Sequence, residues 1–376
     1  MPPPPRARAT PELPDELMEE VLLRIRPDDP VGLLRAALAC KQWHSFIADP
    51  DFRRRRLSLS LHGAAPPMLG VIVSVWDDGD RRPFARYVPT SSYVPPRADH
   101  RDWMLSDARH GRVLLRRCIE WEYWDFTVWN PITDQMLELP KPSDSLGRNG
   151  SMKASVLCAA IGVRVSKDMF TCIYSSESDA WSKPAYDSYP YYNLGWEDDG
   201  LGWERSVLVG NALYLVLRRY DNILECDLGT RKISIIKLPY VRTETTSAGF
   251  VRIELTTMED GQLGFARVEG SHELCLWLRN GDNGVAGWSL CKVIDLKKLF
   301  PLVNSICLMN CLVGFADGIS VAFLEVDREL FTVDIKSGLK KKIVEGCSIS
   351  YAAPYFNFCT SALVVSSRDD GPRVGT

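Results

Sequence analysis

A chain of 376 residues, 45% of them hydrophobic, is long enough for one small and one large domain, each with its own core. The 45 basic and 48 acidic residues leave a formal net charge of -3, which excludes a field of one sign that would attract nucleic acid. The amino terminus lacks the apolar core of a secretory signal, and residues such as Arg164 and Asp317 interrupt the longest apolar stretches. We therefore expect an intracellular protein of the cytoplasm or nucleus, with neither nucleic acid nor a membrane as a partner.

The cysteines and histidines predict no metal site, no cofactor and no histidine-based catalysis. Eleven cysteines, an odd number, are spread from Cys40 to Cys359 without the spacing of a disulfide framework. The closest spacing, Cys307 to Cys311, has no second pair or nearby histidine to complete a zinc site. The five histidines are isolated from one another.

Residues 1–9 form a proline-rich tail that we expect to be disordered, and three short helices follow it. The first helix is predicted from Pro14, at its first turn, to about Arg26, because Leu17, Met18, Val21, Leu22 and Ile25 share one face. The second begins at Asp29 and Pro30 and contains Leu33 and Leu34, and the third contains Trp43, Phe46 and Ile47. The basic run 53–56 is interpreted as a solvated turn, with a nuclear-import or nucleic-acid patch as the alternative.

Residues 10–57 are too few to bury all of their apolar surface, so we expect a partner to cover the remainder. This segment resembles an F-box in several motifs that occur in the expected order. The motifs are Leu13-Pro14-Asp15-Glu16-Leu17, Val21-Leu22-Leu23-Arg24-Ile25, Leu33-Leu34-Arg35-Ala36, Cys40-Lys41-Gln42-Trp43 and Asp49-Pro50-Asp51-Phe52.

The resemblance implies that the segment docks on a Skp adaptor, which links it to a cullin and to a ubiquitin-conjugating enzyme. The positions that it implies as adaptor contacts are Leu13, Pro14, Leu17, Leu33, Leu34, Cys40, Lys41 and Trp43. Leu17, Leu34 and Trp43 have an alternative interpretation as core residues of the bundle. Ala39 departs from the bulkier aliphatic residue that the family often has before the cysteine.

Residues 58–376 are predicted to form a large all-β domain, because short β-rich runs alternate with turn sequences. The predicted strands are 69–76, 112–115, 126–129, 169–174, 213–217 and 274–278. A weak repeat, in which a strand ends in a polar turn before the next strand, recurs about every fifty residues, the length of a four-stranded propeller blade. Its copies lie at 127–133, 172–177, 224–229 and 331–337. A β-propeller of about six blades follows, with a β-sandwich as the alternative.

The second domain is similar to the F-box-associated and kelch-like regions of plant F-box proteins. The likeness rests on Val128-Trp129-Asn130-Pro131-Ile132-Thr133 with Leu139-Pro140, Tyr174-Ser175-Ser176 with Ala180-Trp181, and Val333-Asp334-Ile335-Lys336-Ser337. The Gly-Gly pairs of full kelch blades do not occur.

An aromatic segment between residues 181 and 203 is a candidate substrate-binding surface, because tyrosine and tryptophan offer large contact areas with few rotatable bonds. The candidates are Tyr186, Tyr189, Tyr191, Tyr192 and Trp196. The alternative is that these rings pack back on a blade.

The sequence therefore predicts a non-catalytic substrate receptor of a Skp-cullin-F-box ubiquitin ligase, which docks the adaptor through the F-box and an unknown target protein through the β domain. One alternative is an adaptor-bound scaffold that directs no ubiquitylation. Another is a propeller enzyme, but no phosphate-binding loop, nucleophile elbow or dinucleotide fingerprint is present.

Overall fold

The computed structural model divides into two compact units, which are described separately: residues 1–67 with 359–376, and Met68–Phe358. The first strand after the F-box segment begins at Met68, one residue before the predicted start at Leu69. The structure describes residues 14–25, 32–33, 35–36, 41–49, 52, 68–76, 83–109, 111–119, 123–141, 151–155, 159–163, 168–175, 178–188, 205–217, 222–239, 252–258, 260–270, 272–280, 287–304, 308 and 311–356. The proline-rich tail and the basic run 53–56 lie outside these residues.

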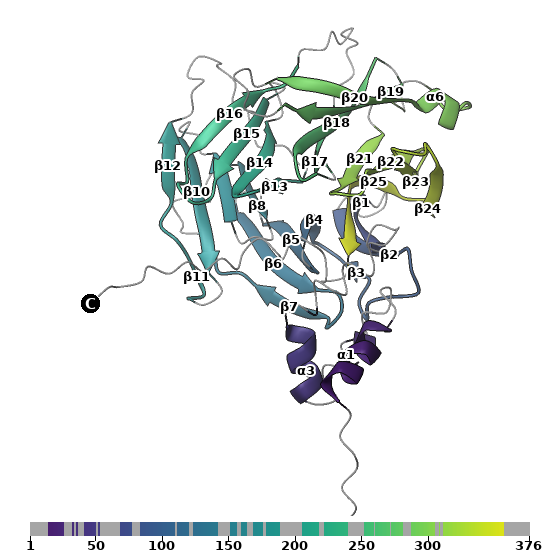
Figure 1. Cartoon of the computed structure of the whole chain (residues 1–376). Helices are drawn as coiled ribbons and strands as arrows, with labels where there is room; N and C mark the ends of the chain where they lie inside the picture. The colour runs from purple at the N-terminus through teal and green to yellow at the C-terminus, as the bar shows by residue number, and fades with distance from the viewer. Residues whose placement is uncertain are drawn as a thin grey trace, which may run out of the picture. The chain divides into compact units, whose positions relative to one another are not determined.

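The first unit is helical where it is described (Figure 1). Helix α1 (Asp15–Leu23) begins one residue later than predicted, because Pro14 is its N-cap; the Pro14 carbonyl accepts hydrogen bonds from the amides of Leu17 (3.0 Å) and Met18 (3.1 Å). It ends before Arg26, since its last turn tightens and the Ile25 amide bonds to the Leu22 carbonyl three residues back. Residues 32–33 and 35–36 are also helical, and helix α3 (Lys41–Ala48) contains Trp43, Phe46 and Ile47, as predicted for the third helix.

The helical unit has a small core and a polar link between its helices. The side-chain amide of Gln42 on α3 donates a 2.9 Å hydrogen bond to the Asp15 carboxylate on α1. The buried apolar side chains are Met18, Leu22, Leu33, Ala36, Ile47 and Phe52.

The second unit is a β-propeller, as predicted, and its described strands form six antiparallel sheets arranged in a ring (Figure 1). Five of them have four strands and one has five. In order within each sheet they are β25 (Ser348–Phe356), β1 (Met68–Trp76), β2 (Pro83–Pro89) and β3 (Asp99–His100); β4 (Met104–Arg109), β5 (Arg112–Ile119), β6 (Tyr123–Asn130) and β7 (Gln135–Glu138); β8 (Ser151–Ser155), β9 (Ala159–Val163), β10 (Asp168–Ser175) and β11 (Ala180–Trp181), with β12 (Ala185–Ser188) also on β10; β13 (Val207–Val209), β14 (Ala212–Leu217), β15 (Asn222–Asp227) and β16 (Ile233–Lys237); β17 (Ile253–Thr257), β18 (Leu263–Glu269), β19 (Glu273–Arg279) and β20 (Trp288–Asp295); and β21 (Leu312–Ala316), β22 (Val321–Val326), β23 (Glu329–Asp334) and β24 (Lys340–Glu345). A short helix, α6 (Leu296–Leu299), follows β20.

The first strand of each sheet is its innermost, and neighbouring innermost strands contact each other around the ring: β25 with β4, β4 with β8, β13 with β17, β17 with β21 and β21 with β25. The ring is closed by the two ends of the unit, since β1 pairs with β25 from Met68 opposite Phe356 to Trp76 opposite Ser348. One inner contact is close enough to require glycine: a Cβ added to Gly314 on β21 would lie 2.0 Å from the carbonyl oxygen of Ala352 on β25.

The sequence repeat is the turn that follows the third strand of four sheets. A side-chain oxygen at the end of the strand accepts a backbone amide hydrogen bond two or three residues later: Asn130 from Ile132 (3.1 Å), Ser175 from Ser178 (3.4 Å), Asp227 from Thr230 (2.7 Å) and Asp334 from Ser337 (2.7 Å). Each turn then has a left-handed residue, respectively Asp134, Asp179, Arg231 and Gly338. The repeat is therefore a property of blade geometry.

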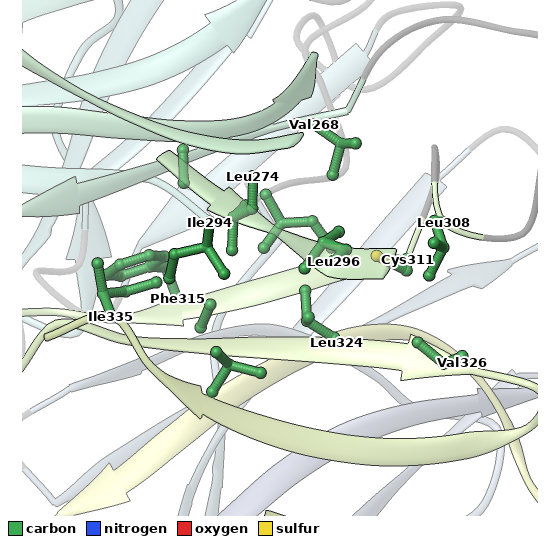
Figure 2. Packing of buried hydrophobic residues seen from close by; sticks show 14 of the residues in the cluster. Val268, Leu274, Ile294, Leu296, Leu308, Cys311, Phe315, Leu324, Val326 and Ile335 are labelled. Atoms are coloured by element: carbon green, nitrogen blue, oxygen red, sulfur yellow. The ribbon is translucent and has the colours of Figure 1, made fainter. Parts of the chain in front are cut away.

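The cores lie between neighbouring sheets. Figure 2 shows one of them, where Val268, Leu274 and Ile294 of the β17–β20 sheet pack with Phe315, Leu324 and Val326 of the next sheet. A second core joins Val71, Val73 and Phe84 of the closing sheet to Phe323 and Leu330. The β17–β20 sheet supplies side chains to two cores, since Phe265 and Leu255 also pack with Tyr214 and Ile223 of the preceding sheet.

Candidate functional site

Helix α1 exposes an apolar stripe. Leu17 and Val21, one turn apart, are 48% and 47% exposed, whereas Met18 and Leu22 on the adjacent face are buried. A helix that buries one apolar face and leaves a second open is typical of a module whose partner covers the remaining surface. Val21 was not among the predicted contacts, although its i, i+4 spacing from Leu17 would have indicated it.

The other predicted adaptor contacts have different surroundings. Pro14 is exposed at the start of α1, Trp43 is half-buried on α3, and Lys41 is the first residue of α3. Leu33 is fully buried in the core of the helical unit. Leu13, Leu34 and Cys40 lie outside the described residues, so their contacts stay predictions.

The predicted aromatic surface is described only at its beginning. Trp181 packs against Tyr174, with ring centroids 5.5 Å apart, and its indole N–H donates a 2.7 Å hydrogen bond to the Pro140 carbonyl. This ring therefore packs back on its blade, as the alternative interpretation has it. The backbone of Tyr186 pairs with Phe170 in the β12–β10 ladder. Tyr189, Tyr191, Tyr192 and Trp196 lie outside the described residues.

A cluster of buried and half-buried polar side chains connects the innermost strands of five sheets. This axial cluster consists of Asp107, Arg109, Arg205, Arg252, Glu254, Asp317 and Tyr351. Asp107 on β4 follows a β-bulge at Ser106 and forms ion pairs with Arg109 (Nε to Oδ2, 2.9 Å) and Arg205 (Nε to Oδ1, 3.8 Å). Arg205, which precedes β13, also pairs with Asp317 at the end of β21.

The second part of the axial cluster ties β17 to the closing strand. Arg252 forms a 2.9 Å ion pair with Glu254 and donates a 2.6 Å hydrogen bond from Nη1 to the carbonyl of Ser350, which a bulge in the β1–β25 ladder leaves outside the register. Tyr351 follows on β25 and is buried beside Arg205 and Glu254. These contacts fasten the inner strands to one another at the ring closure.

Burial and mutual pairing set the electrostatics of the axial cluster. Burial raises the pKa of Tyr351 well above its ordinary value, so its hydroxyl stays protonated. Burial and the charge of Arg109 lower the pKa of Arg205, while Asp107 opposes this effect. Three arginines face three carboxylates, which makes the cluster electrically balanced and suits it to holding strands together.

Sequence reasoning missed the axial cluster, because its members extend from Asp107 to Tyr351 and no local motif unites them. The available signal was a set of charged residues within or beside apolar strand sequences. Of these, the sequence pattern identified only Asp317, as a residue that interrupts an apolar stretch.

Within the described ranges, no group of three or more histidine, cysteine or carboxylate side chains is arranged to hold a metal ion. The helices that the structure describes include none long and apolar enough to cross a membrane.

Solved structures resemble the chain only distantly. A functionally unknown protein from Desulfotomaculum acetoxidans has a TM-score of 0.40 and 11% identity, covering 74% of this chain and 89% of its own. A putative 6-phosphogluconolactonase from Bacteroides uniformis has a TM-score of 0.45 and 8% identity, covering 76% of this chain and 98% of its own. The periplasmic gluconolactonase of Pseudomonas aeruginosa has a TM-score of 0.42 and 12% identity, with coverages of 76% and 98%. No curated protein matches the sequence.

Two family models match the two units. An F-box-like model matches residues 10–59, which contain the α1 stripe. The model described as F-box protein AT5G49610-like, beta-propeller, matches residues 104–351, more than half of the chain and most of the ring. The chain therefore belongs to the family of F-box proteins with an AT5G49610-like β-propeller.

Proposed function

We propose that this protein is the substrate-recognition subunit of a Skp-cullin-F-box ubiquitin ligase. The observation that carries the proposal is the exposed Leu17–Val21 stripe inside the segment that the F-box-like model matches. An adaptor that covers this stripe removes two large apolar side chains from water, which stabilises the complex. The propeller then holds a target protein near a cullin-bound ubiquitin-conjugating enzyme.

The receptor has no catalytic role in this proposal. The axial cluster is electrically balanced and largely buried, and its charges pair with one another across the innermost strands rather than presenting a nucleophile or general base. The chemistry of ubiquitin transfer takes place on other subunits, in the cytoplasm or the nucleus. Blade-connecting loops, which are free of the sheets' packing constraints, contact the target.

Co-purification of the full chain with a Skp adaptor tests the proposal. A Leu17→Glu, Val21→Glu variant places negative charge on the stripe and should leave the helix intact, because glutamate forms helices well. We expect this variant to lose the adaptor. The matched control is Val94→Glu, Leu137→Glu, which changes a valine and a leucine of the propeller that are slightly more exposed, and it should retain the adaptor.

Circular dichroism establishes that both variants are folded. Retention of the adaptor by the folded Leu17→Glu, Val21→Glu variant would overturn the proposed docking face. Failure of the intact, folded chain to bind any Skp adaptor would overturn the receptor function itself. An intact ligase whose bound partner neither carries ubiquitin nor accumulates when the ligase is blocked would favour the scaffold.

A further inference from the structure

Two lysine-bearing segments that are far apart in the sequence meet at the outer side of the propeller. The ammonium group of Lys340, on the outermost strand β24, donates a hydrogen bond to the carbonyl of Leu299 at the end of α6 and lies 4.4 Å from the centroid of the Phe300 ring. Phe300 packs edge-on against Phe331 of the neighbouring strand, with centroids 5.1 Å apart. The contact joins two segments that carry exposed lysines, and we call these lysines the basic edge: Lys297 and Lys298 of α6, and Lys340 and Lys341 of β24.

The basic edge has more positive charge than its surroundings balance. The adjacent Lys342 is held by Glu329 (3.1 Å) and Glu345 (2.5 Å), and Lys298 lies 3.9 Å from Asp295. Among the residues that the structure describes, no carboxylate forms an ion pair with Lys297, Lys340 or Lys341. The whole chain has a net charge of -3, so this local excess does not follow from its composition.

Exposed leucines flank the same two segments. Leu302, just after α6, is 99% exposed, and Leu339, just before β24, is 72% exposed. A large apolar side chain gains nothing from full exposure to water, and lysines beside it provide both charge and apolar stems. The surface therefore offers attraction for negative charge together with apolar contact.

The edge strand does not suit pairing with a second copy of this chain. The extra residue Ile343 forms a bulge in β24, since Leu330 pairs with Val344 and Phe331 with Lys342. A bulge and a row of lysines both oppose edge-to-edge pairing between identical strands. Nucleic acid would use the lysines but would leave the leucines in water.

We propose that the basic edge binds an acidic peptide segment that carries large apolar side chains, and that this segment belongs to the substrate. The inference rests on the proposed receptor function, for which it specifies the chemistry of the recognised protein. Carboxylates of the segment lie against Lys297, Lys298 and Lys341, and its apolar side chains contact Leu302 and Leu339.

Fluorescence anisotropy of the full chain with a short labelled peptide of glutamate, aspartate and leucine tests this inference. We expect a Lys297→Glu, Lys298→Glu, Lys341→Glu variant to bind the peptide about tenfold more weakly or worse, since each reversal removes an attraction and adds a repulsion. Raising the salt concentration from about 50 mM to about 300 mM should also weaken binding by the intact chain. The matched control is Lys183→Glu, Lys232→Glu, Lys237→Glu, three exposed lysines of other sheets, which should bind as the intact chain does.

Three results would overturn the inference: equal binding of a peptide with amides in place of the carboxylates, equal loss of binding in the control variant, or binding of RNA or anionic vesicles without binding of the peptide.

The Leu17→Glu, Val21→Glu variant separates the two proposals. If it loses the adaptor and keeps the peptide, both proposals hold. If the intact chain binds the peptide but no adaptor, only the receptor function fails, and if it binds the adaptor but no peptide, only the basic edge fails.

Discussion

In the helical unit, two apolar side chains of α1 are half exposed beside a core of a few residues, whereas in the propeller three arginines and three carboxylates are paired along the innermost strands. The difference follows from size. A short bundle cannot enclose all of its apolar surface, so Leu17 and Val21 remain open to a partner. A ring of six sheets encloses enough volume to bury even Asp107 and Arg205, provided that each charge has a counterpart.

The arginines of the two units give the largest expected contrast. Arg205→Ala removes a buried guanidinium that pairs with both Asp107 and Asp317, so that Asp107 keeps its pair with Arg109 and Asp317 loses its pair with Arg205. The free energy of unfolding should fall by about 3 kcal/mol, the lower end of the cost of breaking a buried ion pair. Arg24→Ala breaks the exposed 2.6 Å pair with Glu20 on α1 and should cost less than about 1 kcal/mol. Urea unfolding followed by tryptophan fluorescence measures both. Similar losses for the two variants would show that the axial cluster is not electrostatically buried.

Acid should destabilise the propeller through His100. Burial, followed by the charge of Arg97, lowers the pKa of this ring to about 4, and the ring packs 4.1 Å from Trp129. The unfolded chain binds a proton near pH 6.5, so the stabilising contribution is present above that pH and is lost as the pH falls towards 4. Solvent screening keeps the total loss to at most about 3 kcal/mol. Unfolding of the wild type and of His100→Asn should therefore diverge less at about pH 4.5 than at about pH 7.5. Parallel pH profiles would contradict the burial of the neutral ring.

The smallest expected effect is on the stability of the Leu17→Glu, Val21→Glu variant. Both side chains are about half exposed, so thermal unfolding of the isolated full chain should change by no more than about 0.5 kcal/mol, even though adaptor binding is lost. A loss of about 2 kcal/mol or more would place the stripe in the core of the helical unit and would weaken the contrast between the two units.

Local features of the fold were predictable from the sequence. All six predicted strands are present, as β1, β5, β6, β10, β14 and β19, because alternating β-branched and aromatic residues report on strands directly. The turn repeat was also visible, since Asp227 and Asp334 act within three residues of their own positions. Helix α1 was placed to within a few residues, and its end differed because a tightened last turn has no strong sequence signal.

Features that depend on distant residues were not predictable. The pairing of Met68 with Phe356 and the approach of Arg252 to Ser350 join parts of the chain that only the closed ring brings together. The same holds for the basic edge, where Lys340 meets α6. No periodicity of one segment reports such contacts, and one sequence without relatives to compare carries no covariation.

The pairing of the first strand of the propeller with its last also affects how the protein is made. Sheets such as β13–β16 consist of consecutive strands and can form as they leave the ribosome, but β1 lacks its inner neighbour until residues 348–356 have been synthesised. Val71 and Val73, which are buried in the finished ring, remain without that cover for most of translation. Ribosome-bound chains stopped before residue 348 should therefore recruit chaperones that bind unpaired apolar strands, and release of the full-length chain should end this association.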